Sequence, residues 1–402
     1  MSLTVTLRQR ALVSDKLRSD SVQTTLDHLP GSVVRGAFAA AWLADHGGTA
    51  DTDRAGFLRL FEAGVRYGPL FVGRPPTPLS IVTHKYRYQT SGQVCPDLEC
   101  DEALTGDAPP YCGTCGVPLE PARGARDKSE TSRRASVSIH SSGVAVRGQL
   151  VTRETLSPEQ AFRGNLVADP TLLDRLAGLG PIRVGGRRTT HGRAEVAVDA
   201  AAPELPERLP DGRVVLRLRS PGIFVDNSGR PSRDPNAAEL AELVGSAVTV
   251  HRRWFRWATV PGWHAASNLP KPSELAVAAG STYLISADGG IGADTLAAMA
   301  ARGIGLRRCE GFGDLGGPFP IEPGGRALSE RARQEAKQAR AVAKDAGLNQ
   351  KEQAAAMEAL TAYVRGEITN VELIGRIRQI PERVERHLRG LPARYQKPGA
   401  GG

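Results

Sequence analysis

The chain has 402 residues, of which 40% are hydrophobic and 24% charged, and its formal net charge is +9. This composition excludes a chain that is disordered throughout, and the sequence lacks the run of about eighteen apolar residues that would cross a membrane. The N-terminal residues alternate apolar and polar, without the apolar core of a signal peptide. We therefore expect a cytoplasmic protein of two or three domains.

The first half of the chain alternates strand and helix patterns. Residues 3–13 predict a strand, and Pro30-Gly31-Ser32 opens a helix that Ser32 can cap and Gly47 can end. Asp53 can cap a second helix. The remaining predicted elements are strands at 65–72, 136–156, 161–168 and 194–198, with a helix from Asp169-Pro170 before the last of them.

The second half repeats this order. The predicted elements are a bent strand or strand pair at 214–225, a helix at 237–245, strands at 248–260 and 281–288, a helix at 292–303 and a strand from 316. This is the split βαβ order, twice over. We therefore predict an α+β protein with two ferredoxin-like (RRM-like) βαββαβ domains in tandem, residues 1–200 and 201–325. Residues 326–402 form a predicted helical tail.

Four of the five cysteines gather within the first predicted domain, between residues 95 and 115. Cys95 and Cys100 are followed by the Cys112-x2-Cys115-Gly116 sequence, in a stretch poor in aliphatic residues. Four thiolates in paired spacing are typical of a closed, tetrahedral zinc site, because a CxxCG turn supplies two ligands at once. We predict that residues 92–135 are a zinc-ribbon insertion with one structural zinc per chain. Cys309 is expected to take no part.

Two Gly-rich turns occupy equivalent places in the two halves, at residues 185–193 and 303–313. Glycines allow backbone amides to approach a phosphate closely, and arginines add bidentate, charge-assisted contacts. Such turns suit a ribose-phosphate backbone whose bases are not distinguished. The basic members are Arg187, Arg188, Arg193, Arg307 and Arg308.

Several segments resemble the RAMP superfamily of CRISPR effector subunits. They are the helix start LPGSVVRGAFAAAWL, the stretch NLPKPSELAVAAGSTYLI and the turn EGFGDL. The layout over roughly residues 1–320 is similar to the large two-domain, group-5-like RAMP of type III-D complexes. The first turn departs from the family pattern, because Thr190 stands where a second glycine of a GxG pair is expected.

The resemblance implies a non-catalytic RNA-binding subunit of a type III ribonucleoprotein. The subunit would grip the 5′ repeat-derived end of the guide RNA and contact the polymerase-like large subunit and the backbone subunits, in a hetero-oligomer. Target RNA near the guide 5′ end is a further candidate partner. Besides the five arginines of the turns, the candidate RNA-binding residues are Ser32, Arg35, Lys85, Gly311, Phe312 and Gly313.

Two other functions stay open from the sequence. Some RAMP proteins cleave guide RNA precursors without metal, using a histidine as general acid or base, and the candidates here are His28, His84, His140 and His191. A lone histidine is more often a surface or core residue, so we predict no catalytic residue. The other alternative is a stand-alone zinc-ribbon RNA-binding protein.

An aromatic cluster stands apart from the turns. Residues 251–257, HRRWFRW, are followed by Trp263 and His264. Such a cluster can stack RNA bases between rings and guanidinium planes. Alternating aromatic residues on a strand are also typical of a core face with an exposed rim, so the sequence leaves both interpretations open.

Overall fold

In a computed structural model of the chain, the described residues are 1–321 apart from 15–21, 86–88, 91–92, 95–98, 107, 109, 113–115, 123–126, 203, 265–266 and 268. The predicted helical tail, residues 326–402, lies outside them. The chain forms two compact units, Met1–Leu79 with Arg123–Phe319, and Ser80–Ala122 with Pro320–Gly402. No helix among the described residues has the length and apolar character needed to cross a membrane.

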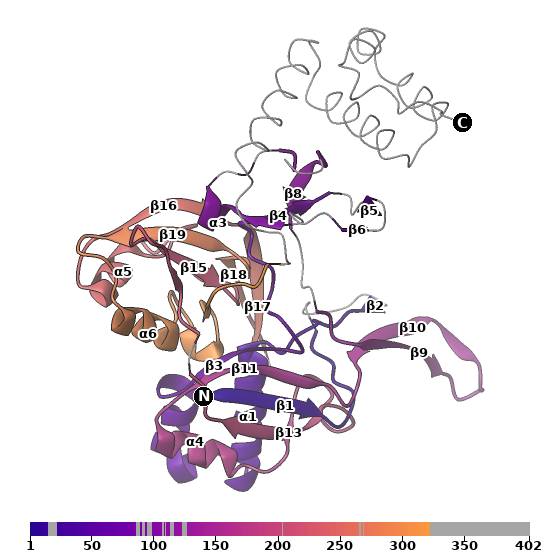
Figure 1. The fold of residues 1–402 in the computed structure, drawn as a ribbon. Helices are drawn as coiled ribbons and strands as arrows, with labels where there is room; N and C mark the ends of the chain where they lie inside the picture. The colour runs from indigo at the N-terminus through magenta and orange to yellow at the C-terminus, as the bar shows by residue number, and fades with distance from the viewer. Residues whose placement is uncertain are drawn as a thin grey trace, which may run out of the picture. The chain divides into compact units, whose positions relative to one another are not determined.

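The first half is built on a five-stranded sheet whose neighbours are all antiparallel (Figure 1). Its order is β12-β13-β1-β11-β3. The strands are β1 (Ser2–Leu7), β3 (Arg66–Phe71), β11 (Ala161–Val167), β12 (Ile182–Arg183) and β13 (Arg193–Asp199). The helices are α1 (Gly31–Asp45), α2 (Arg54–Leu58) and α4 (Pro170–Ala177), with single turns η1 (Asp51–Asp53) and η2 (Arg59–Ala63).

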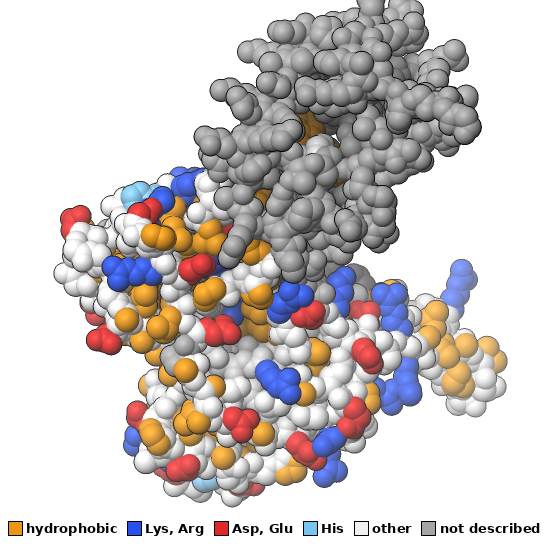
Figure 2. All heavy atoms as spheres, viewed as in Figure 1, with side chains coloured by type: hydrophobic (Ala, Val, Ile, Leu, Met, Phe, Trp, Pro, Cys, Tyr) orange, Lys and Arg blue, Asp and Glu red, His pale blue; other side chains and the backbone are white. Residues whose placement is uncertain are grey.

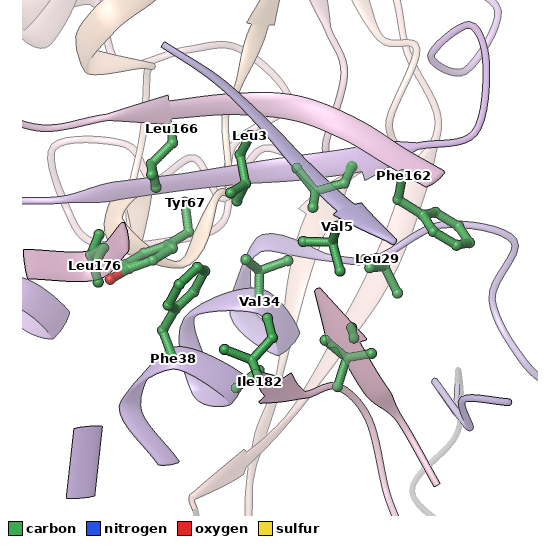
Figure 3. Close-up of a cluster of buried hydrophobic side chains, with 14 of the residues drawn as sticks. Leu3, Val5, Leu29, Val34, Phe38, Tyr67, Phe162, Leu166, Leu176 and Ile182 are labelled. Carbon is green, nitrogen blue, oxygen red and sulfur yellow. The ribbon is translucent and has the colours of Figure 1, made fainter. Parts of the chain in front are cut away.

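Helices α1 and α4 cover one face of this sheet. Leu3 and Val5 of β1 are fully buried against Val34 and Phe38 of α1 and Leu176 of α4 (Figure 3). The intervening threonines of β1 turn to the other face, as the period of two in a strand requires. Each buried Val, Leu or Phe stabilises the fold by about 1.5–3 kcal/mol, so this cluster is the main core of the first half.

The second half repeats the strand order of the first. Its sheet runs β14-β15-β19-β16, and β20 pairs with the same edge of β15 as β14 does. The strands are β14 (Glu207–Arg208), β15 (Val214–Leu218), β16 (Val248–Trp254), β19 (Thr282–Ala287) and β20 (Leu315–Gly316). Helices α5 (Ala237–Val244) and α6 (Ala293–Arg302) pack on it, and η3 (Arg308–Glu310) precedes β20.

Two hairpins extend from these sheets. One consists of β9 (Thr131–Ile139) and β10 (Ala145–Leu156), and β2 (Val22–Gln23) pairs with β10. The other consists of β17 (Trp257–His264) and β18 (Leu269–Val277).

The described elements of the second unit all lie within residues 80–122, apart from the gaps given above. It contains β4 (Ile81–His84), β5 (Gln89–Thr90), β6 (Gln93–Val94), β7 (Glu99–Asp101), α3 (Glu102–Thr105) and β8 (Leu119–Pro121). Strands β7, β4 and β8 form one sheet, and β5 pairs with β6.

A buried ion cluster joins the two halves of the first unit. Asp314, just before β20, is fully buried and forms ion pairs with Arg66 of β3 and Arg219. Arg66 also donates to the carbonyl oxygens of Ala300 and Ala301 at the end of α6, both at 2.7 Å. Each of the three side-chain nitrogens of Arg66, a residue of the first half, therefore donates a hydrogen bond to a residue of the second half.

Several predicted elements have other bounds. The first strand ends at Leu7 rather than residue 13, and residues 248–260 form two strands, β16 and β17, that belong to different sheets. The predicted insertion, 92–135, is offset from the second unit, because its last residues begin β9. Strand β18 was missed, since its two prolines are atypical of a strand interior.

Candidate nucleic-acid interface

The first Gly-rich turn is tied to the segment that follows β1. The amide of Gly186 donates to the carbonyl of Leu12 (2.8 Å), and the amide of Gly192 donates to that of Arg10 (2.9 Å). Gly185 and Gly192 have φ of +78° and +82°, and a Cβ at either would overlap a carbonyl oxygen of the chain. Glycine is therefore required here for the chain's own packing, and this packing holds Arg10 beside the turn.

The β9–β10 hairpin supplies two more arginines. Arg134 and Arg153 lie directly opposite each other in the ladder, so their side chains share one face. Arg153 Nε donates to Oε1 of Gln23 at 2.9 Å. Figure 2 shows basic and hydrophobic side chains along this hairpin.

The imidazole of His191 lies within electrostatic range of arginines from the first turn, the hairpin and the segment after β1. Burial lowers the pKa of His191, and four positive charges lower it further, those of Arg10, Arg187, Arg134 and Arg153. The ring is therefore neutral at pH 7, because its ordinary value is 6.5. Charges act on a neighbouring group in this way only when they are close to it. We call Arg10, Arg134, Arg153 and Arg187 the arginine cluster.

The arginine cluster is not neutralised by the carboxylates that the structure describes. Among the residues that the structure describes, none of its members forms an ion pair with a carboxylate, whereas the adjacent Arg133 is paired with Glu154 (3.2 Å). Arg188 and Arg193 of the same turn are also exposed and unpaired within this part of the chain. Clustered guanidinium groups without counter-charges are suited to bind phosphate oxygens.

The second Gly-rich turn is neutralised instead. Arg307 forms ion pairs with Glu310 (2.8 Å) and Glu274, and Arg308 pairs with Glu239 (2.8 Å). Burial alone would raise the pKa of Glu310, but hydrogen bonds from Arg307 and Lys271 lower it to about 2. These arginines have been predicted to hold phosphates, and in this structure they hold carboxylates of the chain.

The glycines of the second turn lie at the seam between the two halves. Gly311, with φ of +85°, packs its Cα against that of Gly31 at the start of α1, and a Cβ would overlap the carbonyl oxygen of Tyr67. Phe312 is buried, with the Arg307 guanidinium 4.7 Å from its ring centre. Gly313 likewise leaves no room for a Cβ beside Ile304. The requirement for glycine thus comes from backbone packing within the unit.

The other predicted RNA-binding residues, Ser32, Arg35 and Lys85, are not members of the arginine cluster. Ser32 does not cap α1, which begins at Gly31 with Pro30 in the N-cap position. Arg35 is paired with Glu62 and donates to the carbonyl of Phe61. Lys85 is exposed and belongs to the second unit.

The candidate histidines occupy unrelated environments. His28 lies 3.0 Å from a carboxylate oxygen of Asp27, and His84 is buried in β4. His140 is exposed at the end of β9, and only His191 lies within the arginine cluster.

Of the four predicted zinc ligands, the structure describes two. Cys100 on β7 and Cys112 are both buried. Cys112 begins a tight turn, in which its carbonyl accepts from the amide of Gly116 and its amide donates to the carbonyl of Val117, both at 2.7 Å. Gly116 has φ of +71°. Cys95 and Cys115 lie outside the described residues.

A family comparison bears on this arrangement. Residues 166–315, which include both Gly-rich turns, match the family model for CRISPR-associated proteins called Cas_Cmr3. This stretch is Cmr3-like. The match confirms the resemblance to a RAMP-like subunit of type III CRISPR effectors, whereas subtype III-D stays a prediction. No curated protein matches the sequence.

Solved structures show a distant likeness. A chain of the type III-B Cmr-beta complex bound to cognate target RNA has a TM-score of 0.41 and 11% identity, over 71% of this chain and 86% of that one. A chain of the Csm3-Csm4 subcomplex in the type III-A interference complex has a TM-score of 0.31 and 12% identity, over 70% and 92%. CRISPR-associated protein Cas6 has a TM-score of 0.33 and 8% identity, over 80% of this chain and 98% of that one.

Proposed function

We propose that the chain is a non-catalytic RNA-binding subunit of a type III CRISPR effector. It grips the 5′ repeat-derived end of the guide RNA and contacts the polymerase-like large subunit and the backbone subunits. The observation that carries the proposal is the arginine cluster, in which four guanidinium groups from three segments of the chain converge without carboxylate partners among the described residues. The family match over residues 166–315 supports the assignment to an effector.

The proposed scaffold is a pair of ferredoxin-like RAMP domains. In the first half, the strands β13-β1-β11-β3 stand in the order 4-1-3-2 of a split βαβ unit, with α1 and α4 as its two helices. In the second half, β20-β15-β19-β16 have the same order with α5 and α6. The first Gly-rich turn precedes strand four of its domain, which places the arginine cluster at the end of that sheet.

The salt dependence of RNA binding tests this function. Each phosphate contact contributes a slope of about −0.7 to log K against log salt for single strands. Replacing Arg134, Arg153 and Arg187 by glutamine should therefore make the slope shallower by about 2 and weaken binding of repeat-derived RNA. Filter binding at several salt concentrations measures the affinity for RNA and hence the slope.

The control removes one positive charge elsewhere. Arg213 is partly exposed and paired with Asp211, so Arg213→Gln should leave the slope unchanged. An equal loss in this control, or none in the triple variant, would count against the arginine cluster. RNA recovered from these mixtures should keep its length. Cut products that disappear in His191→Ala would favour the endoribonuclease alternative.

We further propose one structural zinc, held by Cys95, Cys100, Cys112 and Cys115. Two buried thiols, one of them at the start of a tight turn with a glycine at positive φ, support this donor set. Four thiolates would close the coordination sphere, so the metal would stabilise the fold of residues 80–122. The few buried apolar side chains described there include Ile81, Val82 and Val117.

Elemental analysis should find one zinc per chain in the purified protein. Cys112→Ser should lose the metal and increase proteolysis within residues 80–122, while Arg123–Phe319 stays protected. Cys309→Ser is the matched control, because Cys309 lies in the other unit, and it should retain the zinc. A metal-free wild-type protein, or global unfolding of Cys112→Ser, would contradict the proposal.

A further inference from the structure

Large exposed apolar side chains gather on the β17–β18 hairpin. Trp257 and Trp263 are 46% and 49% exposed, and Leu275 is 43% exposed. Tryptophan offers more apolar area than any other side chain, so two half-exposed tryptophans on one hairpin leave a large apolar area available to a partner. The arginine cluster does not include this hairpin, so the proposed function leaves these residues unexplained.

The ladder register separates the two faces of the hairpin. The paired residues Val260 and Glu274 turn inward, where Val260 packs with Phe312 and Glu274 pairs with Arg307. The neighbouring pair in the register has the opposite orientation, and it includes Leu275. Trp257 and Trp263 are also exposed, roughly 20 Å apart along the strand at about 3.3 Å per residue. This spacing suits separate bases rather than a single one.

Charge distinguishes the outward face from a protein-docking surface. Glu274 is the only carboxylate between His251 and Gly280, and it is turned inward and neutralised. Arg256, next to Trp257, is exposed and forms no ion pair with any residue that the structure describes. Aromatic rings beside a free guanidinium, without negative charge, complement single-stranded nucleic acid.

We propose that Trp257 and Trp263 are stacking platforms for unpaired bases of single-stranded RNA, with Arg256 at a phosphate. The proposal rests on the proposed RNA-binding function and adds a second contact region to it. Stacking makes this region sensitive to the presence of bases but tolerant of their identity, because every base has a π-face.

The experiment compares two RNAs on the full chain. One is a single-stranded mixed-sequence oligonucleotide, and the other is an abasic ribose-phosphate oligonucleotide of the same length. We expect the first to bind at least tenfold more tightly and to quench tryptophan fluorescence. Trp257→Ala and Trp263→Ala should each weaken binding of the first RNA about tenfold and leave the abasic oligonucleotide unaffected. Phenylalanine at either position should restore most of the affinity.

Leu269→Ala is the matched control, because Leu269 is 59% exposed on the same hairpin but is not aromatic. Its RNA affinity should stay unchanged. Equal affinity for the two oligonucleotides would overturn the stacking proposal. So would tryptophan variants that bind RNA normally but fail to assemble with other effector subunits. If the triple arginine variant binds both oligonucleotides normally, the proposed role of the arginine cluster in RNA binding is wrong. The result for the tryptophan variants then still decides the stacking proposal.

Discussion

Asp314→Asn is expected to lower the free energy of unfolding by about 3–5 kcal/mol, because it leaves Arg66 and Arg219 buried without their negative partner. Urea denaturation followed by circular dichroism measures the loss. Asp294→Asn is the control, since Asp294 is an exposed carboxylate at the start of α6 and should change stability little. Equal stability of Asp314→Asn and the wild type would mean that this ion cluster does not join the halves.

The same carboxylate gives the expected loss a pH dependence. Burial alone would raise the pKa of Asp314, but the charges of Arg219 and Arg66 lower it below its ordinary value of 3.8. Its contribution is therefore complete above about pH 4 and is lost as the pH falls through the lower, folded-state value. The difference in the free energy of unfolding between the wild type and Asp314→Asn should therefore disappear in that acidic range. A wild type that stays more stable than Asp314→Asn below this pH range would show that the ionised Asp314 is not the source of the difference.

Gly31→Ala is expected to destabilise the protein by about 2 kcal/mol or more, since its methyl group would overlap the carbonyl oxygen of Tyr67 and crowd that of Glu310. Both obstacles are backbone atoms, which cannot rotate away. Thermal unfolding measures the change. Gly36→Ala in the same helix has nothing within 4 Å of its added Cβ and should stabilise by about 0.5–1 kcal/mol. Similar effects of the two substitutions would show that α1 and the second turn do not depend on this contact.

Local signals in the sequence were sufficient for many elements. Asp53 caps α2 as predicted, accepting from the amide of Gly56 at 2.9 Å. Pro170 occupies the first turn of α4, and the period of two in β1 separates its buried leucines and valine from its threonines. These features depend on residues a few positions apart, where backbone geometry follows from residue type.

Features that depend on distant partners could not be predicted. Ser32 follows Pro30-Gly31 and was predicted to cap the helix, but α1 begins at Gly31, which packs against Tyr67 and Gly311. The partners of Arg308 and Arg307 include Glu239 and Glu274, which come from other elements. No local pattern reveals such pairs.

Most members of the arginine cluster could not be predicted either, because they come from distant parts of the chain. Arg187 was predicted from its turn, whereas Arg10, Arg134 and Arg153 were missed. Arg134 lies in a stretch assigned to the predicted insertion, and only the register of β9 against β10 places it opposite Arg153. The adjacent pair Arg133-Arg134 was the available signal, and the structure pairs its first member with Glu154.

The pairing of β3 with β11 has a consequence for how this sheet tolerates change. Phe71 and Arg163 are opposite each other in the ladder, so the chain leaves the sheet and returns to nearly the same point. The entropy of closing such a loop grows only logarithmically, and doubling its length costs about 0.6 kcal/mol. The segment between β3 and β11 can therefore lengthen or shorten during evolution with little effect on the sheet. Synthesis of the chain must, however, proceed past Asp199 before the strands of the first half can all pair.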